Sequence, residues 1–343
     1  MTRGHRPPTA GTLAALALAG AAFFFGGGIA VSQPADVAAI AGAAPSATAL
    51  QQIRMATLTT PDLERTLRHY TEWLDHKVRE RGTVSQGLAN SWGTPRVAGR
   101  EYVLLSSDAS PDSFIRVVHS PDVARVAPLT TFGWNAIELI VDDPVRLFEG
   151  LRRSPFEVIG EPAPLGSYPT IVAFQIAGFA GEVVYLTAET GDRSRSILPL
   201  PNGRIGRVFI MVLAASNVRA TLDWYAKVFS LTPGPLRMRP NRMISRAQAL
   251  PPETALPIAT ARLGAAGNLI EFDGYSDKAT PRPTAENELP AGIVMTTFTT
   301  RQLGELRLPW ISPPAVQPGL AYGGKRAATL RGPDGELIEL VEE

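Results

Sequence analysis

The chain ends in the stretch that decides its fold, Gly332-Pro-Asp-Gly-Glu-Leu-Ile-Glu-Leu-Val-Glu-Glu343. The Pro-Asp-Gly segment is typical of a turn, and the alternation that follows it predicts a strand with two different faces. Leu337, Glu339 and Val341 share one face of this strand, and the residues between them share the other. A carboxylate between hydrophobic residues is unusual on a strand that only covers a surface. Glu339 is therefore a candidate functional residue.

Three copies of this stretch occur upstream, and each again predicts a strand. In the position of Glu339 they have Glu271, Tyr185 and Arg116, of which the copy with Arg116 is the loosest. The copies are Gly264-Ala-Ala-Gly-Asn-Leu-Ile-Glu-Phe272, Gly178-Phe-Ala-Gly-Glu-Val-Val-Tyr-Leu186 and Pro111-Asp-Ser-Phe-Ile-Arg-Val-Val118. Four copies of one closing strand predict four copies of one structural module.

A second repeat supports this interpretation. Leu67 and Tyr70 lie on a predicted helix, and both residue types recur 155 positions later as Leu222 and Tyr225. Each of these helices follows a predicted strand and begins at a capping Asp or Asn. A third helix begins at Asp143-Pro144, and a short fourth one is expected around Leu303 and Leu306. The unit is thus strand, helix and three strands, four times over.

The amino-terminal segment predicts export. Arg3, His5 and Arg6 precede an uncharged apolar run up to Val31, so residues 1–32 are interpreted as a secretory signal, with an uncleaved membrane anchor as the alternative. Residues 33–51, rich in Ala, Pro and Ser, are predicted to be a tether. Either alternative places the protein in the periplasm or outside the cell.

Composition excludes several classes of function. The chain has 343 residues, too many for one ordinary core, and its formal net charge of +1 gives no sign of a nucleic-acid partner. It has no cysteine, which excludes disulfides, thiolate metal sites and cysteine nucleophiles. The expected partner is a small molecule, and the oligomeric state stays open.

The repeated unit resembles the βαβββ module of the vicinal oxygen chelate superfamily, which includes glyoxalase I, bleomycin-resistance proteins and extradiol dioxygenases. The capped helix at 62–70 and the Pro-Asp-Gly-Glu-Leu-Ile-Glu-Leu ending carry this resemblance. It implies an α+β fold in which modules pair and each pair encloses one cavity. We expect consecutive modules to pair, as residues 52–190 and residues 207–343, with a linker at 191–206.

The resemblance also implies where a metal would bind, namely at a first-strand ligand and the closing-strand Glu. Counting seven residues back from the helix caps gives Met55, Ala136 and Ile210, and about Met295 in the fourth module. None of these is a usual ligand for a divalent metal. The three histidines beyond the amino-terminal segment lie on or near the first helix or at a strand end, so they do not assemble a two-His-one-carboxylate site. We therefore predict no metal and no cofactor.

In the first expected pair, Arg116 and Tyr185 replace the ligand Glu, and Glu138 shares the inner face with Ala136. These groups are candidates to bind an anionic substrate through Arg116 and to move a proton through Glu138 and Tyr185. Met55 and Trp92 are candidate pocket residues. The alternative is that Arg116 and Glu138 only satisfy each other as a buried ion pair.

In the second expected pair, Glu271 and Glu339 remain without a histidine beside them. They are candidates for substrate binding, for a weak oxygen-ligand site, or for a general base. The alternative is that both are relics paired with nearby arginines, of which the loop at 237–246 offers four.

The leading hypothesis is a metal-independent lyase or isomerase that moves a proton on a small aromatic or carbonyl compound. The second is a protein that binds and sequesters a hydrophobic small molecule, as resistance members of the superfamily do. A metal-dependent dioxygenase or glyoxalase is the third and least favoured, because one fold supports many chemistries and the usual ligands are missing.

Overall fold

The computed structural model describes residues 48–165 and 168–343. The predicted signal or anchor at residues 1–32, and the tether up to residue 47, lie outside the described residues. Within the described part, no helix is long and apolar enough to cross a membrane. The end of the predicted tether needs a correction, because residues 48–50 are buried and the Ala49 amide donates to the Phe229 carbonyl at 2.9 Å.

The helices and strands fall into four successive modules. The first contains β1 (Ile53–Thr60), α1 (Leu63–Trp73), β2 (His76–Thr83), α2 (Gln86–Ser91), β3 (Glu101–Ser107) and β4 (Phe114–His119). The second contains β5 (Gly133–Val141), α3 (Pro144–Leu151), β6 (Glu157–Leu165), β7 (Tyr168–Ala177) and β8 (Val183–Glu189). The third contains β9 (Ile205–Ala215), α4 (Val218–Phe229), β10 (Arg237–Pro240), α5 (Arg242–Ala247), β11 (Ala255–Arg262) and β12 (Leu269–Gly274). The fourth contains β13 (Gly292–Thr300), β14 (Ala315–Val316), β15 (Arg326–Arg331) and β16 (Leu337–Glu342).

Three of the module helices begin as the sequence predicts. The side chains of Asp62, Asp143 and Asn217 each accept a hydrogen bond from a backbone amide in the first turn of α1, α3 and α4. These bonds satisfy amides that have no partner within the helix. The fourth predicted helix is wrong. Around Leu303 the chain forms a single turn, in which the amides of residues 305 and 306 both donate to the Gln302 carbonyl.

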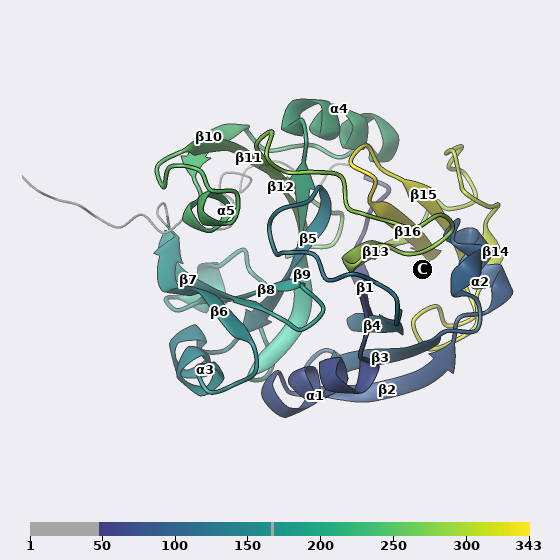
Figure 1. The fold of residues 1–343 in the computed structure, drawn as a ribbon. Helices are drawn as coiled ribbons and strands as arrows, with labels where there is room; N and C mark the ends of the chain where they lie inside the picture. Colours follow the sequence, from purple (N-terminus) through teal and green to yellow (C-terminus); the bar gives the residue numbers. More distant parts are fainter. Residues whose placement is uncertain (1–47, 166–167) are drawn as a thin grey trace, which may run out of the picture. The chain divides into compact units, whose positions relative to one another are not determined.

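The strands form two eight-stranded sheets (Figure 1). The first sheet has the order β14-β15-β16-β13-β1-β4-β3-β2, and the second has β10-β11-β12-β9-β5-β8-β7-β6. Modules one and four therefore share the first sheet, and modules two and three share the second. The predicted pairing of consecutive modules is wrong, although four modules in two pairs are present.

The register shows how this pairing is made. In every module the first strand runs parallel to its own closing strand, as β1 does to β4. The free edge of each first strand then pairs antiparallel with another first strand, β1 with β13 and β5 with β9. Because all four first strands offer an equivalent edge, the repeat specifies the module without specifying its partner.

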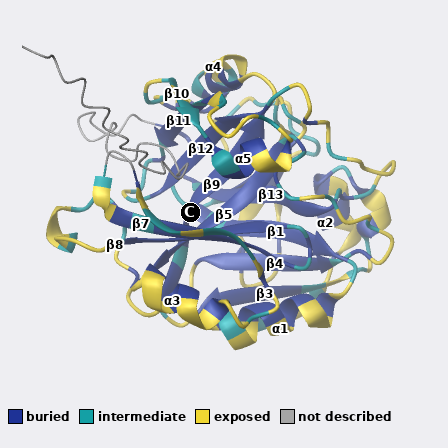
Figure 2. Cartoon of the chain, turned by 60° about the vertical axis from the view of Figure 1, so that its left-hand side comes forward, coloured by how far each residue is buried: buried dark blue, intermediate teal, exposed yellow. Residues whose placement is uncertain are grey.

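Most of the strands are buried, whereas the helices keep an exposed side (Figure 2). The buried hydrophobic residues divide into three clusters. The largest joins α1, α3 and α4 to one face of both sheets, which we call the outer face, through residues such as Leu67, Phe148 and Leu222. The opposite, inner face of the first sheet is covered by α2 and Trp92, and the inner face of the second by α5. As predicted, Leu337 and Val341 lie on the inner face.

Two buried hydrogen bonds join modules that belong to different sheets. Tyr70 of α1 donates to Glu182, which precedes β8, with 3.1 Å between the Tyr oxygen and the carboxylate oxygen. Tyr225 of α4 donates in the same way to Glu336, which precedes β16, at 2.8 Å. The repeated helix and the repeated closing turn thus connect the first sheet to the second twice.

Candidate functional site

The four residues that the sequence singles out on closing strands all lie beside a first strand. Their partners in register are Thr57 for Arg116, Glu138 for Tyr185, Val212 for Glu271 and Thr297 for Glu339. Each of these first-strand residues lies two positions after the one at which the resemblance implies a metal ligand, namely Met55, Ala136, Ile210 and Met295.

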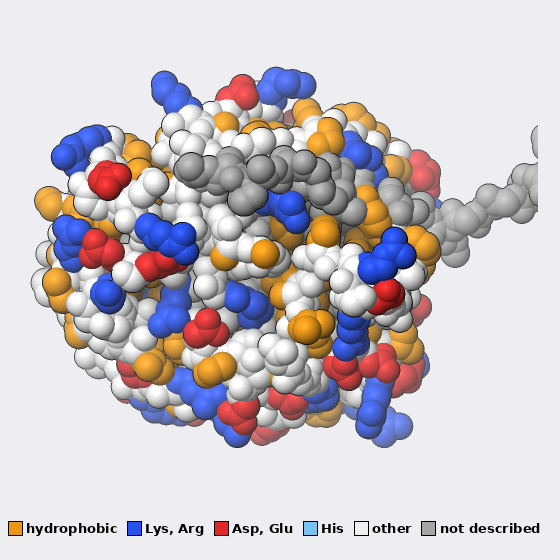
Figure 3. Space-filling view, turned by 180° about the vertical axis from the view of Figure 1, so that it is seen from behind, with side chains coloured by type: hydrophobic (Ala, Val, Ile, Leu, Met, Phe, Trp, Pro, Cys, Tyr) orange, Lys and Arg blue, Asp and Glu red, His pale blue; other side chains and the backbone are white. Residues whose placement is uncertain are grey.

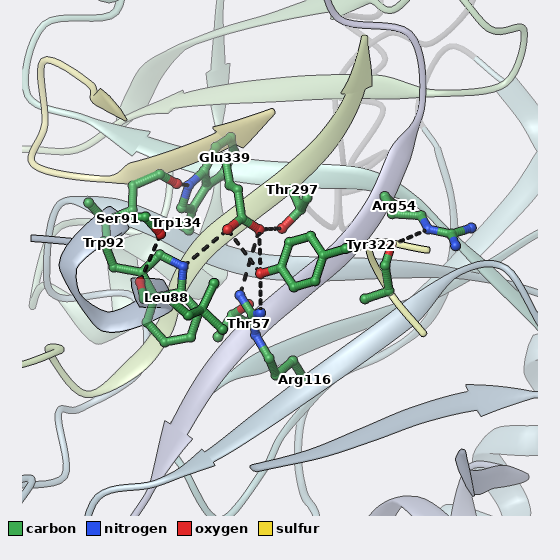
Figure 4. Close-up of polar contacts among 12 residues, drawn as sticks. Arg54, Thr57, Leu88, Ser91, Trp92, Arg116, Trp134, Thr297, Tyr322 and Glu339 are labelled. Carbon is green, nitrogen blue, oxygen red and sulfur yellow. Dashed lines mark hydrogen bonds and ion pairs between the residues drawn. The ribbon is translucent and has the colours of Figure 1, made fainter. Parts of the chain in front are cut away.

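On the first sheet, Glu339 is the centre of a buried polar network (Figure 4). Its carboxylate accepts hydrogen bonds from Trp92 Nε1 at 3.0 Å, from Tyr322 Oη at 3.0 Å and from Thr297 Oγ1 at 2.6 Å. Arg116 Nη2 lies 3.7 Å from Glu339 Oε2 and forms the ion pair of this network. Arg116 and Glu339 are both only 1% exposed, so the pair is removed from water.

Arg116 is held from several sides. Its Nη1 donates to Tyr322 Oη at 2.6 Å and its Nε donates to Thr57 Oγ1 at 3.1 Å. The guanidinium also stacks on Trp92, 4.4 Å from the ring centroid, which is a favourable cation–π contact. Burial acts to lower the pKa of Arg116, but Tyr322 and Glu339 outweigh it and leave that pKa raised. The protein itself therefore neutralises this site.

On the second sheet, Glu138 and Tyr185 lie side by side in register. Glu138 Oε1 accepts a hydrogen bond from Thr187 Oγ1 at 2.5 Å, while Oε2 is buried without a partner. Burial raises the pKa of Glu138 to about 8, with the Thr187 hydrogen bond lowering it and Asp273 raising it. Burial also raises the pKa of Tyr185 well above 10, so its hydroxyl stays protonated. Glu138, which can accept a proton, thus lies beside Tyr185, whose hydroxyl group can donate a hydrogen bond.

Glu271 and Asp273 add two more carboxyl groups to this face. They are two residues apart on β12, so strand alternation points both side chains to the same side. Burial raises the pKa of Asp273, and the hydrogen bond with Glu271 acts in the opposite direction.

The structure separates the residues that the sequence analysis placed in one site. Arg116, Met55 and Trp92 are on the inner face of the first sheet, whereas Glu138 and Tyr185 are on the second. The expectation that Arg116 faces Glu138 is wrong, because module one pairs with module four. Trp92 is fully buried against Arg116 and does not line a pocket mouth. Glu271 and Glu339 are likewise on different sheets.

The predicted arginine partner of Glu339 also needs correction. Glu339 pairs with Arg116 of module one and with no residue of the 237–246 segment in the described contacts. In that segment, Arg242 pairs with Glu253 at 2.9 Å and Arg246 donates to the Ile159 carbonyl at 2.6 Å.

Several polar residues of these faces were missed by the sequence analysis. On the second sheet they are Gln175, Thr187, Asp273 and Tyr275, and on the first they are Thr57, Thr297 and Tyr322. Thr187 and Asp273 lie two residues beyond Tyr185 and Glu271, so strand alternation offered a signal. Tyr322 lies in a loop, where no periodicity predicts the direction of a side chain.

Among the described residues, no group of three or more His, Asp or Glu side chains is arranged to hold a metal ion. Of the first-strand positions where the resemblance implies a ligand, Met55, Ala136 and Ile210 are all buried and apolar. Action without a metal stays a prediction.

Two surface clefts lie away from both inner faces. One of about 720 Å³ and one of about 470 Å³ share Asn202, Gly203 and Arg204 of the linker. Their charged residues are paired with each other, as Arg193 is with Asp142 and Arg204 with Asp75.

Comparison with known proteins supports the fold. Glyoxalase I from Zea mays is similar with a TM-score of 0.56 and 16% identity, covering 85% of this chain and 92% of that one. A putative dioxygenase from Bacillus subtilis subsp. subtilis str. 168 is similar with a TM-score of 0.55 and 10% identity, covering 86% of each chain. No family model and no curated protein sequence matches the chain. The protein thus has the vicinal oxygen chelate fold, with four modules in two pairs.

Proposed function

We propose that the protein is an enzyme that moves a proton on a small carbonyl or aromatic compound, and that its site is the inner face of the second sheet. The observation that carries this proposal is Glu138, a buried carboxyl group with one oxygen lacking a partner, beside the protonated hydroxyl of Tyr185. A base works best when its pKa lies near the working pH, and the pKa of Glu138 is raised to about 8.

In this proposal the ionised Glu138 accepts a proton from the carbon next to a carbonyl group. Tyr185 donates a hydrogen bond to the oxygen on which negative charge develops. Return of the proton from Glu138 to another atom of the enolate completes an isomerisation, and expulsion of a leaving group from that enolate is a lyase reaction. We assign no part to the first sheet, because the charges of Arg116 and Glu339 compensate each other in an ion pair, although Arg116 Nη2 has no hydrogen-bond partner.

The experiment begins with a thermal-shift screen of small carbonyl and aromatic compounds, with and without divalent metals. Compounds that bind are incubated with the protein in D₂O, and proton NMR follows exchange of their C–H groups. We expect Glu138→Gln to preserve binding and to slow exchange by about a hundredfold or more. Glu182→Gln, the same change at a buried glutamate bonded to Tyr70, is the matched control and should leave exchange unchanged.

Sequestration of a hydrophobic small molecule is the second candidate, and burial favours it, because Glu138, Tyr185 and Glu271 are each only 1% exposed. A covered face suits long retention of a ligand as well as it suits chemistry. If bound compounds show no exchange and Glu138→Gln alters only their affinity, the protein binds without turnover.

A small molecule remains the proposed partner. On the face in Figure 3, Lys and Arg side chains are interspersed with Asp and Glu side chains, which does not favour a nucleic acid. Export to the periplasm or beyond is also a proposal, and it rests on the amino-terminal sequence. Cell fractionation with amino-terminal sequencing of the mature protein tests it, since the signal interpretation requires cleavage near Gln33.

A further inference from the structure

In the proposed site, the charged groups that shift the pKa of Tyr185 are acidic. After burial, the groups that raise the pKa of Tyr185 are Asp273, Glu271, Tyr275 and Glu138. Glu138 and Asp273 are buried in an apolar surrounding that includes Ala136, Ile210 and Val212, and no described cation acts on either carboxyl group. Carboxylates that are not matched by a cation are costly in such a place, so they retain protons instead.

Unpartnered polar atoms indicate that something else is meant to occupy this face. Glu138 Oε2, Tyr275 Oη and both amide atoms of Gln175 are buried and have no hydrogen-bond partner. Gln175 is fully buried and lies opposite Tyr185 in register, and Tyr275 is 7% exposed. A buried polar group without a partner costs about 1–3 kcal/mol, so a hydrogen-bonding ligand at this face would recover that loss.

The positive groups nearest this face are already engaged. The Arg282 side chain is half-buried and donates to the carbonyls of Trp134, Ala291 and Ile293. Arg237 and Arg239 stand on the edge strand β10, opposite Ile258 and Leu256 of β11, and each has interactions of its own.

We propose that the inner face of the second sheet binds an organic cation, a protonated amine with an apolar body, whose ammonium group donates hydrogen bonds to Glu138 and to the Glu271–Asp273 pair. This inference rests on the proposed site and names its ligand class. It replaces the anionic substrate expected from Arg116, which is on the other sheet. An ammonium group supplies donors for the free carboxylate oxygen and the countercharge that allows these carboxyl groups to ionise.

Binding of the cation is then coupled to release of protons from the carboxyl groups. Affinity should rise with pH as Glu138 and Asp273 ionise, provided that the amine itself stays protonated. Tyr185 and Tyr275 do not ionise in this range, because burial raises the pKa of both well above 10.

Three probes with one ring test the charge preference: benzylamine, benzyl alcohol and benzoate, titrated into the exported chain by calorimetry. At about pH 8 we expect benzylamine to bind at least about tenfold more tightly than either other probe. Its affinity should fall roughly tenfold towards about pH 6, and buffers of different ionisation enthalpy should reveal proton release. Glu138→Gln and Asp273→Asn should each weaken it about tenfold or more, while Glu336→Gln, at a carboxyl outside this face, should not.

Tighter binding of benzoate, equal binding of all three probes, or no binding of benzylamine would each overturn the proposal. Loss of binding in Asp273→Asn counts only if circular dichroism and the melting temperature show a folded variant. Gln175→Leu, which changes no charge, is a second test and should also weaken the binding of benzylamine. The two proposals fail separately. If a neutral or anionic compound exchanges its protons through Glu138, the proposed function holds and the cation proposal fails. If an amine binds without any exchange, the cation proposal holds and the proposed function fails.

Discussion

At the scale of single residues, Arg116 and Glu138 show that similar burial has different consequences. Arg116 is buried with a carboxylate, a tyrosine and a tryptophan around it, and it stays charged. Glu138 is buried with only a threonine hydroxyl bonded to it, and its pKa is raised to about 8. Arg116 has a buried countercharge in Glu339, whereas Glu138 holds a proton that it can exchange near neutral pH.

Removing Arg116 should therefore affect stability and not the proposed reaction. Arg116→Ala leaves Glu339 as an uncompensated buried charge and should lower the free energy of unfolding by about 3–5 kcal/mol, measured by urea denaturation. Arg116→Met combined with Glu339→Gln should recover much of that loss. Arg326→Ala, which breaks an exposed pair with Glu342, is the control and should have little effect on the free energy of unfolding. A folded, fully stable Arg116→Ala protein that no longer binds ligand would show that this face is the site.

The rate of the proposed reaction should depend on the ionisation of Glu138. A base must be deprotonated to accept a proton, and burial raises the pKa of Glu138 to about 8. Deuterium exchange into a bound compound should thus increase from pH 6 and level off above about pH 8. A rate that is already constant below pH 6 would exclude Glu138 as the base.

At the scale of elements, the helix of one module is tied to the closing turn of the next. Burial raises the pKa of Glu182 to about 7 and that of Glu336 to about 8, with the Tyr70 and Tyr225 hydrogen bonds acting in the opposite direction. Each carboxyl group thus binds its proton more tightly in the folded state than in the unfolded chain, whose reference pKa is 4.5.

Linkage fixes the sign of the resulting pH dependence. The stability that each protonated glutamate contributes is complete below about pH 4.5 and is lost as the pH rises to about 7 and 8. His76 acts in the other direction, because burial lowers its pKa to about 4 and its contribution is lost as the pH falls towards that value. Comparison of wild type with a glutamate variant cancels the His76 contribution.

We therefore expect the stability of wild type relative to Glu336→Gln to decline between about pH 5 and pH 8, by on the order of 3 kcal/mol. Glu182→Gln should show a smaller decline, which begins at the same pH and ends about one pH unit lower. Urea denaturation at several pH values measures both differences. A difference that stays constant with pH, or that grows as the pH rises, would contradict the assignment.

At the scale of the whole molecule, modules two and three are inserted between the two halves of the first sheet. Each sheet takes four strands from residues before the linker and four from residues after it. The two halves of the chain are therefore held together by the antiparallel pairs β1–β13 and β5–β9 as well as by the linker.

Cutting the linker should thus leave the molecule intact. A protease site inserted after the exposed Leu200 should allow complete cleavage, and the two fragments should still elute as one species in size-exclusion chromatography. The uncut protein is the control for elution volume and melting temperature. Separation of folded fragments would support the pairing of consecutive modules and would contradict the strand order described above.

The sequence by itself determined the repeated unit. Strand alternation around Glu339, the capping residues of three helices and the 155-residue spacing of Tyr70 and Tyr225 are local patterns, and the structure confirms the elements that they predict. It also placed Arg116, Tyr185, Glu271 and Glu339 at equivalent positions, because they belong to copies of one strand.

Only the tertiary structure decided which of these residues meet. The register within a module follows from its own strands, but the pairing of β1 with β13 joins residues far apart in the sequence, and four equivalent edges satisfy the same hydrogen bonds. That pairing places Arg116 beside Glu339. It places Glu138 and its neighbour Tyr185 near Asp273 and Glu271. Because β1 pairs with β13, the proposed ligand is a cation and not the anion that the sequence predicted at Arg116.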